Sequence, residues 1–181
     1  MVRAVGTGGV ESQPSSEVSA TPFVVDGGLI MGRYQPMGSS GEIIRDVVTG
    51  LEWQRCSVGQ TWTGSTCSGG ARTYEWDSAV QLTAPGGFRI PTRAELRTIV
   101  YCSNTGNFDS NGVNRSCGSS GTYDRPTIVS EAFPNTPRRT VWSGSPEADS
   151  NNAWGVNFLY GSASSYSRLS GEPVRLVRSG Q

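Results

Sequence analysis

Gly86-Gly87-Phe88-Arg89-Ile90-Pro91-Thr92-Arg93-Ala94-Glu95 sets the architecture of the chain, because it joins a strand directly to a helix. Two apolar residues alternate around Arg89, as in a short half-buried strand. Pro91 ends the strand, since it has no N–H to donate. Thr92 and Glu95 have the spacing of a capping box, in which each side chain bonds the other residue's backbone N–H. We expect a strand followed by a helix that begins after Thr92.

A short amphipathic helix is expected on each side of this strand. Before it, residues 75–82 place Trp76 and Val80 on one helical stripe, and a Pro-Gly-Gly sequence ends the helix. After it, Leu96 and Ile99 supply the apolar face of the second helix. The sequence therefore predicts two short helices in the middle of the chain.

The remaining segments are short extended runs and polar loops. Residues 1–22 lack hydrophobic periodicity and are expected to form a flexible leader before one domain over residues 23–181. Asp46 and Gly50 are suited to a turn, because Asp accepts nearby backbone N–H groups and Gly tolerates positive φ. After that turn, Leu51 and Trp53 share one face of a strand, with the intervening polar residues on the other.

The second half of the chain is expected to alternate short strands with polar loops. Residues 141–145, 153–158 and 174–178 are predicted strands. Residues 103–123 are predicted to be a long polar loop, a kind of segment that is often functional or disordered. Another polar loop is expected over residues 159–172. Four of the five tryptophans lie in apolar segments and are interpreted as core, whereas Trp62 is compatible with a core or a binding role.

The composition argues against several classes of function. The chain has 181 residues, no histidine and a formal net charge of zero, and all 15 of its basic residues are arginine. The missing histidine removes the commonest general base and metal ligand, so we expect a non-enzymatic domain without a metal or other cofactor. Zero net charge gives no reason to expect nucleic acid as a partner. No apolar run approaches the ~20 residues that span a bilayer, and the first residues lack the apolar core of a secretory signal.

The four cysteines are predicted to form two local disulfides, Cys56–Cys67 and Cys102–Cys117. None of them has the Cys-x-x-Cys spacing that zinc sites use. Free buried thiols are the alternative, but all four lie in polar, loop-like segments. Each disulfide would close a polar loop and stabilise the fold by roughly 3 kcal/mol. Disulfides imply an oxidising compartment, so we expect an extracellular or cell-surface location.

Three groups of residues together resemble a known family. The opening group is Arg33-Tyr34…Gly41-x-Ile43-x-x-Asp46-x-x-Thr49-Gly50-Leu51-x-Trp53. The central group is Trp76-x-x-Ala79…Gly87-Phe88-Arg89-Ile90-Pro91-Thr92-x-x-Glu95-Leu96. The final group is Phe133-Pro134-Asn135-Thr136…Trp142-Ser143-x-Ser145…Trp154-x-Val156-x-Phe158-x-x-Gly161…Val174-Arg175-Leu176-Val177-Arg178. Their order and spacing over residues 33–178 resemble the C-terminal domain of bacterial collagen-like surface adhesins.

The resemblance implies an α+β domain of the C-type-lectin-like fold, with two short helices, small antiparallel sheets and extensive ordered loops. It also implies that the final strand pairs near the N-terminal strands, and that the domain binds a protein or glycan on another surface. The broader fold includes the variable proteins of diversity-generating retroelements, whose C-terminal segment is mutated to change specificity. It also includes the formylglycine-generating enzymes, but their cysteines lie late in the chain. Here no cysteine follows Cys117, so that activity is not implied.

The segment 159–170 is the candidate recognition surface, because Tyr, Ser and Gly with an occasional Arg are typical of binding loops. We expect its side chains to face solvent between two buried strands. Its residues also belong to the set that adenine-directed mutagenesis of Asn codons produces, although ordinary Gly/Ser loops have the same composition. The candidate ligand-binding residues are Tyr160, Ser162, Ser164, Tyr166, Arg168 and Leu169.

Alternatives remain open for this segment and for its surroundings. The same residues could form a polar surface loop whose tyrosines cover the core, in a structural or oligomerisation module of a larger surface protein. Residues 149–152 offer oxygen ligands for calcium, but a solvated loop is the preferred interpretation. Arg138 and Arg139 could bind sulfate or carboxylate groups of a glycan, or form an ordinary charged surface.

Overall fold

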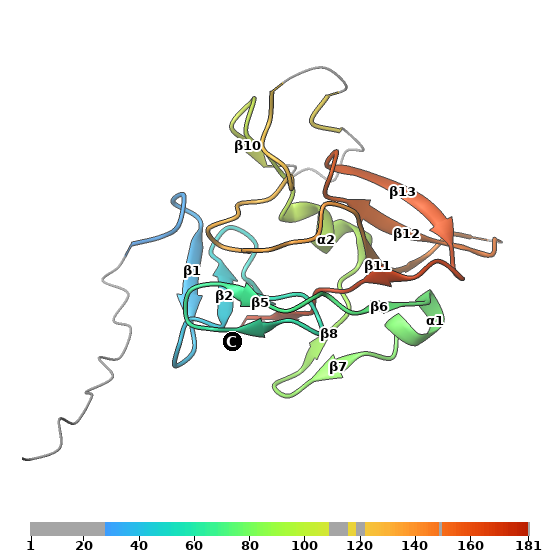
Figure 1. The fold of residues 1–181 in the computed structure, drawn as a ribbon, viewed down its shortest axis with the longest axis horizontal. Helices are drawn as coiled ribbons and strands as arrows, with labels where there is room; N and C mark the ends of the chain where they lie inside the picture. Colours follow the sequence, from blue (N-terminus) through green and yellow to red (C-terminus); the bar gives the residue numbers. More distant parts are fainter. Residues whose placement is uncertain (1–27, 109–115, 119–121, 149, 181) are drawn as a thin grey trace, which may run out of the picture.

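The computed structural model describes residues 28–108, 116–118, 122–148 and 150–180. The expected leader over residues 1–22 and much of the expected loop over residues 103–123 lie outside these ranges. The described residues form small antiparallel sheets with two short helices, which confirms the α+β class (Figure 1).

The larger sheet has six strands that are far apart in sequence. Their order in space is β1-β2-β3-β15-β8-β7, and each pair of neighbouring strands is antiparallel. In chain order the strands are β1 (Tyr34–Met37), β2 (Ile43–Asp46), β3 (Leu51–Gln54), β7 (Thr83–Ala84), β8 (Phe88–Arg89) and β15 (Val177–Ser179). The last strand thus lies between β3 and β8, which confirms that the end of the chain returns beside the early strands.

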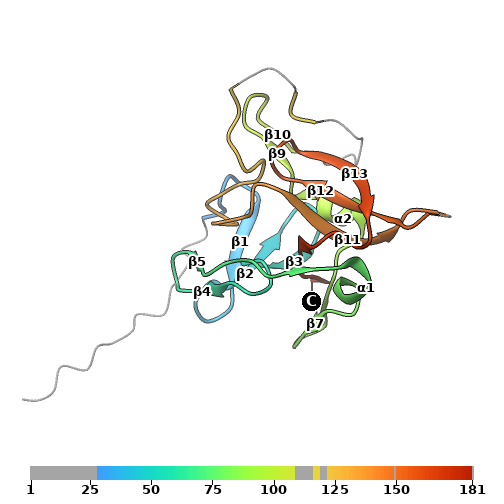
Figure 2. The same cartoon turned by 45° about the vertical axis from the view of Figure 1, so that its right-hand side comes forward.

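A second sheet and three two-stranded ribbons complete the β structure. The second sheet consists of β11 (Thr140–Pro146), β12 (Asn152–Asn157) and β13 (Ser162–Ser167), in that order. The ribbons pair β4 (Thr61–Trp62) with β5 (Cys67–Ser68), β6 (Thr73–Tyr74) with β14 (Glu172–Pro173), and β9 (Tyr101–Cys102) with β10 (Asn107–Phe108). Figures 1 and 2 show the second sheet at one end of the molecule, beside both helices.

The helices are α1 (Trp76–Ala79) and α2 (Arg93–Thr98), each shorter than its apolar pattern suggested. The capping box that the sequence predicts begins α2. The Thr92 hydroxyl accepts the Glu95 N–H at 3.2 Å, and the Glu95 carboxylate accepts the Thr92 N–H at 2.7 Å. The same carboxylate pairs with Arg89 of β8 at 2.7 Å, so the strand and the helix share one acid.

Thr92→Ala should lower the free energy of unfolding by about 1 kcal/mol, because it removes the side-chain acceptor of an N-cap. Thr83→Ala is the matched control, since Thr83 is exposed and makes no side-chain hydrogen bond within the described residues. Urea denaturation of both variants measures the difference. A Thr92→Ala protein as stable as the Thr83→Ala protein, but unable to bind ligand, would show that Thr92 belongs to a binding site instead.

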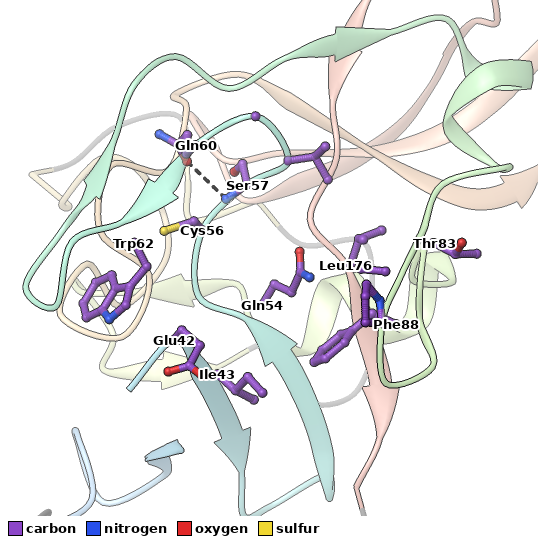
Figure 3. Close-up of a pocket in the computed structure, with 14 residues that line it drawn as sticks. Glu42, Ile43, Gln54, Cys56, Ser57, Gln60, Trp62, Thr83, Phe88 and Leu176 are labelled. Atoms are coloured by element: carbon purple, nitrogen blue, oxygen red, sulfur yellow. Dashed lines mark hydrogen bonds between the residues drawn. The ribbon is translucent and has the colours of Figure 1, made fainter. Parts of the chain in front are cut away.

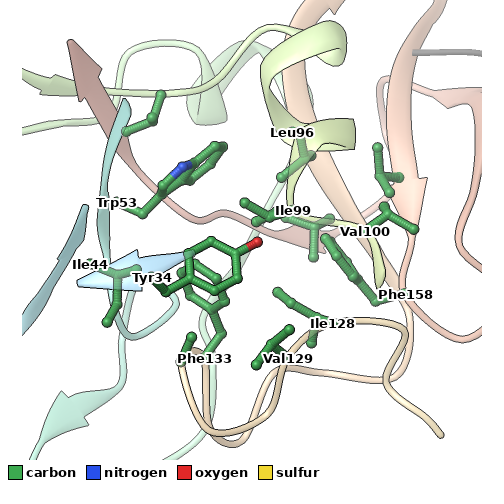
Figure 4. Packing of buried hydrophobic residues seen from close by; sticks show 14 of the residues in the cluster. Tyr34, Ile44, Trp53, Leu96, Ile99, Val100, Ile128, Val129, Phe133 and Phe158 are labelled. Atoms are coloured by element: carbon green, nitrogen blue, oxygen red, sulfur yellow. The ribbon is translucent and has the colours of Figure 1, made fainter. Parts of the chain in front are cut away.

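The main core lies between the two sheets and is closed by α2 and by residues 123–133. From the six-stranded sheet it includes Trp53 and Ile44, which are fully buried, and from α2 it includes Leu96. Figure 4 shows these side chains converging with Tyr34 and Phe133, whose rings meet edge to face with centroids 5.2 Å apart. This core fixes the second sheet against the first, because Val141, Val156 and Ala163 of the second sheet belong to the same cluster.

A smaller apolar cluster lies under α1. It contains Trp76 of α1, the fully buried Trp142 of β11, and Leu176 beside β15. Burial of Trp53, Trp76 and Trp142 confirms their interpretation as core residues. For Trp154 that interpretation is wrong: its side chain is only half-buried and stacks with the Arg93 guanidinium, which lies 4.1 Å from the ring centroid.

A buried ion pair holds the first strands together. Arg33 donates two hydrogen bonds to the Asp46 carboxylate, at 2.8 and 2.6 Å, and a third to the Thr98 carbonyl at the end of α2. Asp46 also accepts the Val48 N–H at 3.0 Å and the Thr49 hydroxyl at 2.7 Å, so the predicted turn is confirmed. Arg33 and Asp46, which both belong to the opening group of the family resemblance, therefore stabilise the fold.

The predicted strand over residues 174–178 is only partly confirmed, because β15 begins at Val177. Arg175 lies just before it and is fully buried. Its guanidinium donates to the carbonyls of Gln54 and Arg55 and to the Thr136 hydroxyl, and burial lowers the pKa of Arg175 to about 9. These bonds join the end of the chain to the β3–β4 connection.

Glu52 differs from the simple alternating pattern. The sequence places it on the polar face of its strand, yet the residue is 1% exposed. Its carboxylate accepts a hydrogen bond from Arg178 of β15 at 2.7 Å. The second face of β3 is therefore covered by the neighbouring strand's arginine, and an ion pair replaces contact with water.

Both predicted disulfides are present. Cys56–Cys67 and Cys102–Cys117 have Cα–Cα distances of 5.5 and 5.2 Å. The first closes the loop that carries the β4–β5 ribbon, and the second connects β9 to Cys117 across the polar segment. Among the described residues, neither helix is long and apolar enough to cross a membrane.

Candidate functional site

The candidate recognition segment is a strand and two turns, so its prediction as a loop is wrong over residues 162–167. These residues form β13, which pairs with β12 along its whole length, from Asn152↔Ser167 to Asn157↔Ser162. β13 is an edge strand, because β12 is its only partner in that sheet within the described residues. The segment is therefore held more rigidly than a loop would be.

Pairing with β12 places three of the six candidate residues on one face of the sheet. Ser162, Ser164 and Tyr166 alternate along β13, and side chains two residues apart point to the same face. All three are partly exposed. Tyr160 precedes this row and two further candidates follow it. We call the six residues the β13 surface: Tyr160, Ser162, Ser164, Tyr166, Arg168 and Leu169.

Tyr160 lies in the turn between β12 and β13, and its side chain is 46% exposed. A backbone hydrogen bond holds this turn, because the Cys117 N–H donates to the Tyr160 carbonyl at 2.9 Å. Gly161 has φ +71°, and a Cβ there would lie 2.8 Å from the Cys117 sulfur. The second disulfide thus supports the backbone of this turn and leaves the tyrosine side chain in solvent.

Tyr166 is half-buried, contrary to the expectation that the side chains of the segment face solvent. Its ring meets Trp142 edge to face, with centroids 6.3 Å apart. Trp142 is itself fixed by a 2.9 Å hydrogen bond from its indole N–H to the Tyr74 carbonyl. Tyr166 therefore has a packing role and presents only part of its ring to a ligand.

Arg168 also contributes to the scaffold. Its guanidinium lies 4.4 Å from the centroid of the Trp76 ring and donates to the Asn152 carbonyl at 3.3 Å. The Arg168 carbonyl accepts the Trp76 N–H at the start of α1, and the guanidinium lies 4.0 Å from Asp77. Leu169 follows with its side chain 78% exposed. The two residues after β13 thus differ: Arg168 holds α1, and Leu169 faces water.

The β13 surface is rich in hydroxyl groups and carries little charge. On the opposite face, hydrogen bonds from the side chains of Ser165 and Ser150 lower the pKa of Glu147. At the far side of the sheet, Arg139 is paired with Glu172 at 2.8 Å, which makes it less available to a glycan sulfate than the sequence suggested. Tyrosine, serine and leucine side chains on a rigid strand can bind by contact area and hydrogen bonding.

The described residues contain no cluster of side chains suited to a metal ion. No group of three or more His, Cys, Asp or Glu side chains converges there. Asp149, the one acid in the segment weighed for calcium, lies outside the described residues. Ser150 donates to Glu147 at 3.1 Å and accepts the Asn152 N–H at 3.1 Å, so its hydroxyl serves a turn.

A separate cleft of about 440 Å³ lies between the first disulfide loop and the β7–β8 hairpin (Figure 3). From the sequence, Trp62 is compatible with a core or a binding role. The structure places its half-exposed ring on one wall of this cleft. Phe88 and Leu176 form the opposite wall, with Gln54 between them. No residue of the β13 surface lines it. Sequence reasoning missed this cleft, because its walls come from four distant segments.

The comparisons with known proteins identify the family. The chain matches the Lcl C-terminal domain family over residues 42–178, which is most of its length. Searches among curated proteins and among solved structures found no significant match. The matched region includes both sheets and both helices apart from the first strand. The chain therefore belongs to the Lcl C-terminal domain family, which confirms the adhesin-type part of the resemblance.

Proposed function

We propose that this domain is a non-enzymatic ligand-binding module of a secreted or surface-displayed protein, and that the β13 surface is its recognition surface. The observation that carries the proposal is the arrangement of exposed Tyr160 and Leu169 at the two ends of a rigid serine-rich edge strand. Membership of an adhesin-type family supports it. The proposed ligand is a protein or glycan on another surface, bound without a cofactor, metal or nucleic acid.

The proposed architecture is a C-type-lectin-like domain over residues 23–181, preceded by a flexible leader over residues 1–22. Antiparallel sheets with the last strand beside an early one support this fold. The two disulfides and the family are compatible with an extracellular or cell-surface location. The sequence supports a function other than catalysis, since it offers no histidine as a general base.

We further propose that a diversity-generating retroelement varies the β13 surface. Support comes from the residues of this surface, which belong to the set that mutated Asn codons encode, and from their exposed or half-exposed positions on a paired strand. Backbone pairing holds the strand, so substitution of its exposed serines, and of Tyr160 and Leu169 at its two ends, should leave the scaffold intact.

Sequencing of the DNA around the gene tests this part. We expect a reverse-transcriptase gene and an imperfect copy of the coding sequence for residues 159–170, with adenines wherever the two copies differ. Differences that fall on other template bases, or a locus without such a copy, would contradict diversification and leave the binding proposal standing.

A structural or oligomerisation module is the second candidate function, and one apolar patch favours it. Met31, Val47 and Val48 are 52%, 45% and 65% exposed at one end of the six-stranded sheet. The Val47 N–H donates to the Arg33 carbonyl at 3.1 Å, which places Val47 beside the segment that contains Met31. Exposed apolar residues that are gathered in one place are typical of contact surfaces.

Binding to protein and glycan arrays, with sedimentation of the same sample, separates the two candidates. The binding proposal predicts specific signals that Tyr160→Ser with Leu169→Ser abolishes. The structural module predicts no array signal and an oligomer that Val48→Ser dissociates. Array signals that survive the Tyr160 and Leu169 changes would contradict the proposed recognition surface.

A further inference from the structure

We propose that the cleft beside Trp62 is a second binding site, which takes one uncharged sugar residue of a glycan. This inference does not depend on the β13 surface, because the two sites share no residue. It rests on three features of the cleft: a fixed aromatic ring, a side-chain amide without a hydrogen-bond partner among the described residues, and the charge of the lining.

The Trp62 ring is fixed on its edge and on one face. Its indole N–H donates to the Ser40 carbonyl at 2.9 Å. The Arg55 guanidinium lies 4.1 Å from the ring centroid, and it is itself held by the carbonyls of Ala132, Glu131 and Gly41. Arg55 covers one face of the ring and is not among the residues that line the cleft. The ring is thus ordered before a ligand arrives, which reduces the entropic cost of binding.

Gln54 supplies the polar group that could orient a ligand. Its backbone is used within the fold, since its N–H donates to Leu176 and its carbonyl accepts from Arg175. Within the described residues its side-chain amide has no hydrogen-bond partner, and Figure 3 shows that side chain between the two walls. An amide both donates and accepts, as do the hydroxyl and acetamido groups of a sugar.

Gln60 shows what a structural amide looks like in the same cleft. Its oxygen accepts the Ser57 N–H at 3.1 Å, and its nitrogen donates to the carbonyls of Gly69 and Asn135. The Gln60 amide is therefore already engaged on both sides. We therefore expect the Gln54 amide to contact the ligand, whereas the Gln60 amide supports the loop.

The charge of the lining selects an uncharged ligand. Glu42 is the only charged side chain among the lining residues. Burial alone would raise its pKa, but hydrogen bonds from its own N–H and from Ser40 outweigh that effect and lower the pKa of Glu42. A fixed carboxylate without a lining cation repels sulfated and uronic sugars. The remaining walls, from Phe88, Leu176 and Val58, are apolar and suit the C–H face of a pyranose ring.

The probes are the methyl glycosides of glucose, galactose and mannose, together with N-acetylglucosamine. Glucuronic acid and N-acetyl-leucine amide serve as the charged and peptide-like comparisons. Titration into ¹⁵N-labelled protein follows the Trp62 indole N–H and the Gln54 side-chain amide by NMR. We expect at least one neutral sugar to shift both signals together, and to do so at lower concentration than either comparison.

Trp62→Ala and Gln54→Leu should each weaken binding of that sugar by about tenfold or more, as for residues at the centre of a binding site. Gln54→Leu serves as the second variant should Trp62→Ala disturb the loop, and Tyr160→Ser should leave this affinity unchanged. The proposal is overturned if no neutral sugar shifts the two signals, if glucuronic acid or the leucine amide binds better, or if both cleft variants bind like the unaltered protein. Because Tyr160 is tested in the same assay, failure here is distinguishable from failure of the β13 surface.

Discussion

Asp46→Ala should lower the free energy of unfolding by about 3–5 kcal/mol, because it leaves a buried arginine without its acid. The Arg33 side chain is 5% exposed, and Asp46 is fully buried. Two of the Arg33 hydrogen bonds end on Asp46, and two more bonds to Asp46 shape the turn between β2 and β3. Chemical denaturation monitored by tryptophan fluorescence measures the loss.

Two further variants show whether the loss comes from the uncompensated charge. Arg139→Ala breaks an ion pair whose arginine side chain is 50% exposed, and it should cost no more than about 1 kcal/mol. Arg33→Met combined with Asp46→Leu removes both buried charges and should recover much of the stability lost by Asp46→Ala. An Asp46→Ala protein within about 1 kcal/mol of the unaltered protein would contradict this account of the pair.

Tyr160→Ser combined with Leu169→Ser should weaken ligand binding by roughly a hundredfold or more, if these residues are the hot spots of the β13 surface. Tyr160 is 46% exposed and Leu169 is 78% exposed, and neither makes a side-chain hydrogen bond within the described residues. Their replacement should therefore change the free energy of unfolding by only ~0.5 kcal/mol each. The effect on affinity is large because exposed aromatic and apolar side chains carry the contact area.

Tyr166→Ser combined with Arg168→Ser provides the matched comparison on the same surface. These side chains pack on Trp142 and Trp76, so their loss should lower the free energy of unfolding by about 1–3 kcal/mol. The four residues were grouped together by sequence alone. Their contacts divide them into a pair that faces solvent and a pair that supports the fold.

The local signals of the sequence predicted local structure well. The capping box, the Asp46 turn and the two disulfides each involve residues near one another in sequence, and all three are present. The position of the last strand beside β3 followed from the family resemblance and is also confirmed. The chemistry of a cap or a turn acts within a few residues, so the sequence shows it directly.

The features that the sequence did not predict depend on distant partners. Residues 162–167 read Ser-Ala-Ser-Ser-Tyr-Ser, which lacks the apolar alternation of a strand, yet pairing with β12 makes them one. Glu52 is buried because Arg178 comes from the far end of the chain. Arg168 holds the start of α1, ninety-odd residues earlier in the chain, and no pattern near Arg168 shows that contact.

The sequence predicted a loop where the candidate segment forms a strand. Three of the six residues of the β13 surface share a face because they alternate on a strand, whereas Tyr160 and Leu169 lie at its two ends. The Trp62 cleft was beyond prediction, since its walls come from the start of β2, the segment from β3 to β4, the β7–β8 hairpin and the residues before β15.

The most direct test measures affinity and melting temperature on the two double variants, using a ligand identified on the arrays. The account predicts that Tyr160→Ser with Leu169→Ser binds roughly a hundredfold more weakly and melts like the unaltered protein. It predicts that Tyr166→Ser with Arg168→Ser melts earlier. A Tyr160 and Leu169 variant that binds the ligand with unaltered affinity would contradict the assignment of the β13 surface as the recognition surface.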